Sequence, residues 1–65
     1  MKVYVALAEQ ADAGHEVLGV YRGLGAIREE HEVEGFDEMV GVVEPRTWVG
    51  KKAPWLVVEE HELEG

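Results

Sequence analysis

The sequence predicts a small α+β domain, an antiparallel sheet of three to five strands with one helix packed on a face, in the chain order ββα(ββ)β. Two apolar segments, residues 3–8 and 16–21, have the composition of strands, and residues 23–33 are the only stretch with helical spacing. The third observation is the run Trp55-Leu56-Val57-Val58, which is apolar, rich in β-branched and aromatic residues, and followed by alternating polar positions. This run predicts a strand that is buried at its start, exposed at its end, and placed beside the N-terminal hairpin.

Residues 2–8 form the first predicted strand. Both of its faces are apolar, one with Val3, Val5 and Leu7 and the other with Tyr4, Ala6 and Ala8. Because neither face is polar, we expect this strand to be central in the sheet. The polar segment 9–14 ends in Gly14 and suits a hairpin connection, and residues 15–22 return as the second strand.

The predicted helix covers residues 23–33. Leu24, Ile27 and His31 fall on one stripe at helical spacing, which gives a narrow apolar face. Gly23 is a tolerable N-cap, and Gly35 is a plausible C-terminal stop.

Residues 36–53 give the weakest pattern. Met39–Val43 predicts a short strand, Glu44–Arg46 a turn, and Thr47–Val49 the returning strand. An irregular loop held by Trp48 as an apolar anchor is the alternative.

Length and charge limit the classes of function. The 65 residues predict a single domain, 1–65, with a small core, and the absence of cysteine removes disulfides and thiolate metal sites. Self-association, as a homodimer, is then the natural way to cover a sheet edge or an apolar face. The formal net charge of −8 argues against direct binding to nucleic acid or to anionic membranes and favours a basic protein partner.

Segments for membrane insertion or export are not predicted. The apolar run Val3–Ala8 has six residues, fewer than a signal-peptide core needs, and no stretch approaches the roughly 20 apolar residues of a membrane span. We therefore expect a cytoplasmic protein.

Both ends of the chain carry a recognisable arrangement. The chain begins with the strand Met1-Lys2-Val3-Tyr4-Val5, and its second strand ends in Gly19-Val20-Tyr21. A short acidic helix follows from Leu24 to Val33, and the last strand, Trp55–Leu63, ends in Glu60-His61-Glu62-Leu63. This arrangement resembles a family of small proteins of bacteria and their phages to which no activity is assigned. The resemblance weakens over residues 34–53 and at Gly23-Leu24-Gly25. It implies the fold and a phage or mobile-element source, with the host cytoplasm as location, and it transfers no site residue.

Acidic residues supply one set of candidate contact residues. Six carboxylates occur between positions 29 and 38, namely Glu29, Glu30, Glu32, Glu34, Asp37 and Glu38, and four more occur at Glu59, Glu60, Glu62 and Glu64. If the helix lay beside the end of the last strand, the two sets would form one negative surface that could mimic nucleic acid. The alternative is a solvated face that keeps the domain soluble.

Catalytic and metal-binding residues are poorly represented. The chain has no Cys or Ser, and its one threonine, Thr47, has no evident His-acid pair, so we expect no enzyme activity. No two of its histidines have the i, i+4 spacing of a helical zinc site, and Gly23-Leu24-Gly25 lacks the third glycine of a dinucleotide-binding turn. We therefore predict no metal and no cofactor, and a small enzyme or metal sensor is the least favoured hypothesis.

Aromatic side chains supply the other contact candidates. The five aromatic residues exceed what a narrow helix face would cover. Most of them are expected in the core, and the alternative is a homodimer or partner interface built around Trp48 and Trp55. The sequence thus favours a non-enzymatic acidic protein that acts by protein–protein interaction, as a phage or mobile-element accessory protein that modulates a host protein. A self-associating structural domain and an acidic nucleic-acid mimic are the alternatives.

Overall fold

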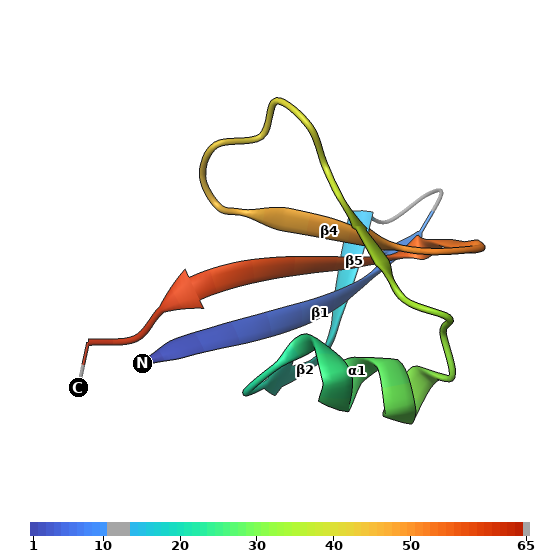
Figure 1. The fold of residues 1–65 in the computed structure, drawn as a ribbon, viewed down its shortest axis with the longest axis horizontal. Helices are drawn as coiled ribbons and strands as arrows, with labels where there is room; N and C mark the ends of the chain where they lie inside the picture. Colours follow the sequence, from blue (N-terminus) through green and yellow to red (C-terminus); the bar gives the residue numbers. More distant parts are fainter. Residues whose placement is uncertain (11–13, 65) are drawn as a thin grey trace.

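The computed structural model describes residues 1–10 and 14–64, and in these residues one five-stranded antiparallel sheet carries one helix (Figure 1). The elements along the chain are β1 (Lys2–Gln10), β2 (Gly14–Tyr21), α1 (Leu24–His31), β3 (Phe36–Glu38), β4 (Thr47–Gly50) and β5 (Ala53–Glu62). The predicted α+β class is confirmed. Of the predicted connection 9–14, residues 11–13 lie outside the described residues.

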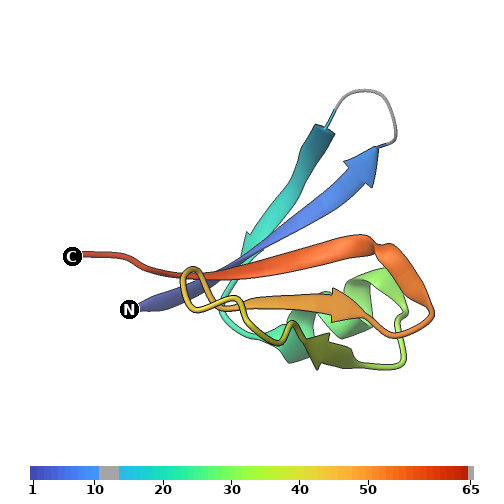
Figure 2. The ribbon, with the colours of Figure 1, turned by 90° about the horizontal axis from the view of Figure 1, so that it is seen from above.

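The strands lie in the sheet in the order β2-β1-β5-β4-β3, with β2 and β3 at the two edges (Figure 2). The predicted order, which follows the chain, does not describe this arrangement, because β5 returns between β1 and β4. β5 pairs antiparallel with β1 from Lys2↔Glu62 to Ala8↔Leu56. The placement of the last strand beside the N-terminal hairpin and the central position of β1 are both confirmed.

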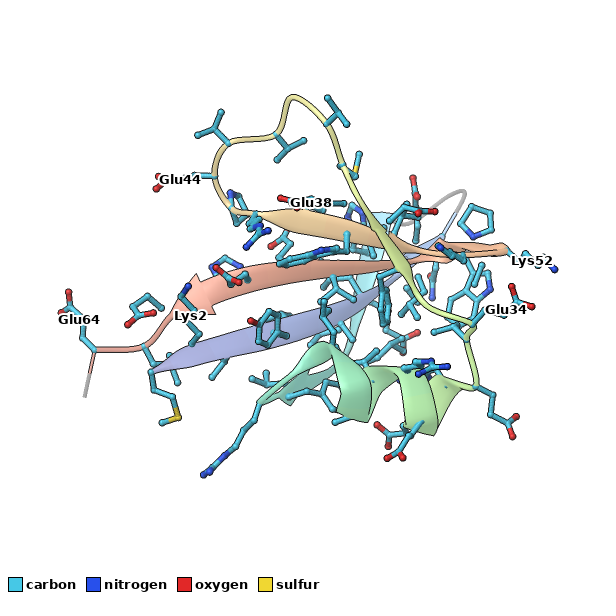
Figure 3. The ribbon with its side chains drawn as sticks, viewed as in Figure 1. Lys2, Glu34, Glu38, Glu44, Lys52 and Glu64 are labelled. Atoms are coloured by element: carbon cyan, nitrogen blue, oxygen red, sulfur yellow. The ribbon has the colours of Figure 1, made fainter. Side chains whose placement is uncertain are left out.

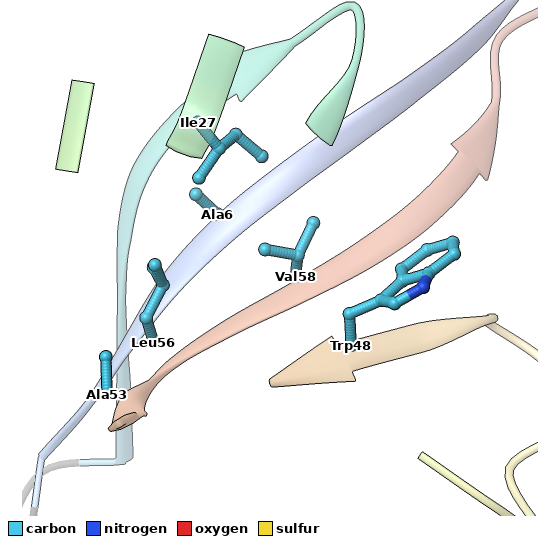
Figure 4. Close-up of a cluster of buried hydrophobic side chains, with 6 residues drawn as sticks. All are labelled: Ala6, Ile27, Trp48, Ala53, Leu56 and Val58. Atoms are coloured by element: carbon cyan, nitrogen blue, oxygen red, sulfur yellow. The ribbon is translucent and has the colours of Figure 1, made fainter. Parts of the chain in front are cut away.

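The helix covers one face of the sheet, which we call the inner face. Ile27 of α1 is fully buried and clusters with Ala6 of β1 and with Leu56 and Val58 of β5, all at 0% exposure (Figure 4). Strand alternation places Val3, Val5 and Leu7 on the opposite face, the outer face. Ile27 therefore anchors the helix at the centre of the core, and the partly buried Leu24 packs beside this cluster.

The helix ends earlier than predicted. Its C-cap is Glu32, in the left-handed conformation with φ 54°, and the Glu32 N–H bonds to the Arg28 carbonyl. Gly35 is therefore not the stop, and Val33 lies after the helix as a partly buried residue against the core. At the other end Gly23 is the N-cap, as expected, without a side-chain cap bond. At eight residues α1 is too short to cross a membrane, and no helix in the described residues could do so.

The predicted strand at Met39–Val43 is wrong. These residues belong to the connection between β3 and β4, in which Gly41 has φ 91° and Val40 is fully exposed. β3 lies three residues earlier, at Phe36–Glu38, and pairs with β4 up to Glu38↔Trp48. The alternative, a loop anchored by Trp48, is also wrong, because Trp48 lies inside β4.

The start of β5 is only partly buried. Leu56 and Val58 face the core, whereas Trp55 is 45% exposed. The strand alternates between the two faces, so the continuous apolar run is divided between the core and the outer face.

Candidate functional site

The six carboxylates of residues 29–38 do not form one unpaired surface. Glu34 lies 3.3 Å from the Lys52 Nζ, Asp37 lies 3.9 Å from the Lys51 Nζ, and Glu38 lies 2.6 Å from the Arg46 Nε. Glu29 and Glu32 are exposed, and no ion pair joins them to another residue in the described part of the chain. Of the six, the acids without an ion pair therefore lie at the helix, and cations face those from Glu34 to Glu38.

The C-terminal acids begin at β5 beside Arg46 and end far from Glu34. Figure 3 shows Glu34 and Glu64 at opposite ends of the long axis. Glu60 and Glu62 are also paired, with Lys2 at 3.6 Å and with the N-terminal amine at 3.2 Å. The two acidic sets do not merge into the continuous negative surface that the nucleic-acid mimic hypothesis requires.

Trp48 is part of the core. Its exposure is 8%, and its ring lies 5.8 Å from the Tyr4 ring, centroid to centroid. The Arg46 guanidinium covers the indole at 5.1 Å and makes two hydrogen bonds, of 2.6 and 2.9 Å, to the Glu38 carboxylate. This bidentate contact lowers the pKa of Glu38 and raises that of Arg46. Trp48 is therefore covered and cannot serve as an interface side chain without rearrangement.

A hollow of about 570 Å³ opens beside this cluster, between the start of β1, the end of β5 and the β3–β4 connection. Its lining cations include Lys2 and Arg46, and both already face carboxylates, at Glu60 and Glu38. Burial, followed by a hydrogen bond to Glu60, raises the pKa of Tyr4 above 10.0. The two lining cations Lys2 and Arg46 are thus paired within the protein and are not free for an incoming ligand.

Tyr21 connects the edge strand to the helix. Its hydroxyl donates a hydrogen bond to Glu30 and lies 3.2 Å from the His31 Nε2. The bond to Glu30, helped by burial, raises the pKa of Tyr21 above 10.0, so the phenol is neutral at pH 7. Glu30, a predicted contact residue, therefore holds α1 to β2. In the described residues no group of three or more His, Asp or Glu side chains is arranged to hold a metal ion.

The outer face of the sheet carries a continuous apolar row. Cross-strand pairing places Val17 of β2 beside Leu7, Leu7 beside Val57, and Val57 beside Val49 of β4. Val5 and Val20, also paired with each other, adjoin the row on one side, and Trp55 lies on the same face by alternation from Val57. Three of these side chains are well exposed, Val17 at 62%, Val20 at 60% and Trp55 at 45%.

No element of the described chain packs on this face, because the one helix lies on the inner face with Ile27 against Ala6 and Leu56. Comparisons with protein-family models, with curated proteins and with solved structures found no match. The resemblance to the bacterial and phage proteins stays a prediction.

Sequence reasoning selected Trp55 but missed the aliphatic part of this surface. The sequence of β1 did indicate this aliphatic surface, because both faces of the strand are apolar although only one of them can pack against the single helix. The position of Val20 was harder to read, because a bulge in β2 changes the alternation between Val17 and Gly19.

Proposed function

We propose that this chain is a protein-interaction domain and that its contact surface is the outer face of the sheet. The observation that carries the proposal is the apolar row Val17, Leu7, Val57 and Val49 with Trp55 beside it, in a chain of net charge −8. Val17 and Trp55 are exposed, and the other three side chains are partly buried. Contiguous exposed apolar side chains of this kind mark sites of protein contact, and tryptophan commonly contributes much of the binding energy.

The acidic side chains have a different part in this proposal. They give the whole domain a net negative charge, which favours a basic partner and repels acidic ones. Glu29 and Glu32 are the candidates for this steering, since they are exposed and outside the ion pairs of the described residues. The resemblance to phage proteins makes a host protein the first partner class to test.

The experiment compares two variants with equal charge. In the face variant, Val17→Lys and Trp55→Lys replace exposed apolar side chains, and in the helix variant, Glu29→Gln and Glu32→Gln remove exposed acids. Both change the net charge from −8 to −6, so a difference between them does not come from net charge. Each protein is immobilised, incubated with a lysate of the cells in which the chain is encoded, and the retained proteins are quantified by mass spectrometry.

We expect a captured protein that is retained equally by the wild type and the helix variant. The face variant should retain at least about tenfold less of it, because it lacks two side chains that contribute to the interface. Circular dichroism of each variant checks that the fold is intact. Retention by the face variant together with loss by the helix variant would instead assign binding to the acidic helix and contradict the proposal.

A further inference from the structure

The apolar row of the outer face ends in a carboxylate. Asp37 of β3 pairs with Val49 of β4, the last apolar residue of the row, so their side chains point to the same face. Asp37 is exposed, and its one ion pair in the described residues is with the Lys51 Nζ at 3.9 Å. Exposed pairs of this kind contribute little, so the carboxylate can accept a second cation.

Carboxylates also lie on both sides of the row. Glu9 follows Leu7 by two positions in β1, and Glu59 follows Val57 by two positions in β5, so alternation places both on the outer face. Because β1 and β5 are antiparallel, the two acids lie on opposite sides of the row, roughly 14 Å apart along the strand direction. Glu9 is exposed, and Glu59 is partly buried with the His61 Nε2 at 3.0 Å.

Lysine and arginine are absent from the described strand positions of this face. Of the six in the chain, only Lys2 lies in a strand, and alternation places it on the inner face with Ala6. The other five lie in the helix or in the connections between elements, namely Arg22, Arg28, Arg46, Lys51 and Lys52. The charged strand residues of the outer face are therefore acids, apart from its histidines.

This distribution of charge decides which occupant the face favours. An apolar sheet face is covered by a second sheet or by a helix. The outer face of a second copy would bring the same three acids and no lysine or arginine from its strands, so carboxylates would lose water without gaining a cation. A partner with lysine or arginine beside its apolar side chains would instead pair with all three acids.

We propose that the outer face binds a basic amphipathic helix of another protein. The apolar stripe of that helix lies on the row, and its lysine or arginine side chains reach Glu9, Glu59 and Asp37. A helix with its side chains is roughly 10 Å wide, so it fits between Glu9 and Glu59. This inference rests on the proposed function, because it names the partner class and the charge-selecting residues of the same surface.

The acids of the helix α1 provide a control for these contacts. Glu29 lies in α1 and Glu32 is its C-cap, and α1 covers the inner face through Ile27. Both acids are exposed and contribute to the net charge, but neither lies on the outer face. Removing them therefore changes long-range attraction without removing a contact to a helix bound on the row.

The first test uses two model peptides of about 15 residues, roughly four helical turns each. One has leucine at helical spacing and lysine at the remaining positions, and in the other glutamate replaces lysine. Binding is measured by titration calorimetry at physiological ionic strength, so that long-range charge effects are screened. We expect a dissociation constant on the order of 10 μM for the lysine peptide and binding at least about tenfold weaker for the glutamate peptide.

The second test compares two neutralised proteins. Glu9→Gln with Asp37→Asn removes two exposed acids of the outer face, and Glu29→Gln with Glu32→Gln removes two exposed acids of α1. Both change the net charge from −8 to −6. We expect the first protein to bind the lysine peptide at least about tenfold more weakly than the wild type, and the second to remain within about threefold. Equal weakening of the two would show that net charge alone attracts the peptide and would overturn the proposal.

Charge reversal tests the same contacts in the opposite direction. Glu9→Lys with Asp37→Lys should prefer the glutamate peptide, whereas Glu29→Lys with Glu32→Lys should keep the preference of the wild type. Circular dichroism checks that each variant is folded. In the wild type, amide chemical shifts should change on addition of the lysine peptide at Leu7 and its strand neighbours, and changes confined to α1 would overturn the proposal.

The outcomes also separate this inference from the proposed function. A chain that retains a lysate protein through Val17 and Trp55 but does not distinguish the two peptides would overturn the basic helix and leave the interaction surface in place. A dimer that is lost in the face variant would assign the surface to a second copy and likewise overturn the basic helix. If neither peptide binding nor protein retention depends on Val17 and Trp55, both proposals fail.

Discussion

The ring of Tyr21 lies against Gly19, two residues earlier in β2. A Cβ atom at Gly19 would lie 3.0 Å from the Tyr21 hydroxyl oxygen and 3.1 and 3.2 Å from two of its ring carbons. The missing side chain therefore leaves the ring the position from which its hydroxyl reaches Glu30 of α1. A backbone feature of the edge strand thus supports the contact between strand and helix.

We expect Gly19→Ala to destabilise the domain by about 1 kcal/mol, although alanine in a strand is ordinarily better than glycine. The new methyl group displaces the Tyr21 ring and weakens its bond to Glu30. Gly25→Ala is the matched control, because a Cβ there meets nothing within 4 Å and helix propensity gains about 1 kcal/mol. Urea unfolding measures both, and a Gly19→Ala protein as stable as the wild type would contradict the prediction.

Both tyrosines should lose their phenol protons at a higher pH than an unperturbed tyrosine does. Both tyrosines of the chain have pKa values raised above 10.0, Tyr4 chiefly by burial and Tyr21 chiefly by its bond to Glu30. A raised folded pKa means that the stabilisation is complete below pH 10 and is lost as pH rises through the folded value. We expect Glu30→Gln to lower one of the two transitions in tyrosinate absorbance and leave the other unchanged. Two unchanged transitions would show that Glu30 does not hold Tyr21.

Ile27 is the one buried residue of α1. We expect Ile27→Ala to cost about 3 kcal/mol, through lost burial and the cavity left over Ala6, Leu56 and Val58. Because a domain of this size has a stability of only about 5 kcal/mol, the variant should unfold at a much lower urea concentration. Ile27→Val, which removes one methylene, should cost about 1 kcal/mol. Equal losses for the two variants would indicate that the helix does not depend on this contact.

Periodicity and composition predicted the fold class, the central place of β1 and the neighbouring place of β5, because these follow from long apolar segments. They did not locate β3. Met39–Val43 is as apolar as a strand, but Gly41 and the exposed Val40 place it in a connection, while the polar Phe36-Asp37-Glu38 pairs with β4. At an edge, pairing geometry outweighs residue preference.

The prediction of the contact residues was limited in the same way, because it also depends on which strands pair. Trp55 is exposed as an interface residue requires, whereas the burial of Trp48 depends on Tyr4 and Arg46, which are distant in sequence. Ion pairs such as Glu38–Arg46 likewise depend on the pairing of β3 with β4. Single-sequence patterns contain no information about which charges meet across strands.

The two tryptophans should differ in fluorescence. Trp48 is 8% and Trp55 45% exposed, and they are the only tryptophans of the chain. We expect Trp55→Phe, which leaves Trp48, to emit at shorter wavelength and to be quenched severalfold less by acrylamide than Trp48→Phe. The measurement is made at low protein concentration, so that association does not shield Trp55. Equal quenching of the two variants would contradict the placement of Trp48 in the core.

The Glu38–Arg46 pair predicts a pH-dependent contribution to stability. Its two hydrogen bonds hold the pKa of Glu38 below the ordinary value of 4.5, and they also fix the guanidinium over Trp48. A lowered folded pKa means that the stabilisation is present above pH 4.5 and is lost as pH falls through the folded value. Arg46 keeps its charge throughout, so only protonation of Glu38 breaks the pair.

We therefore expect Glu38→Gln to unfold more easily than the wild type at about pH 7, with the difference shrinking in acid and disappearing once the pH is below the lowered pKa of Glu38, where the wild-type carboxyl is protonated too. Glu29→Gln, at an exposed position with no ion pair to the described residues, should show no loss at about pH 7. Urea unfolding at the two pH values measures the difference. A Glu38→Gln deficit that persisted unchanged in acid would mean that the carboxylate charge is not its cause, because at that pH both proteins present a neutral group to Arg46.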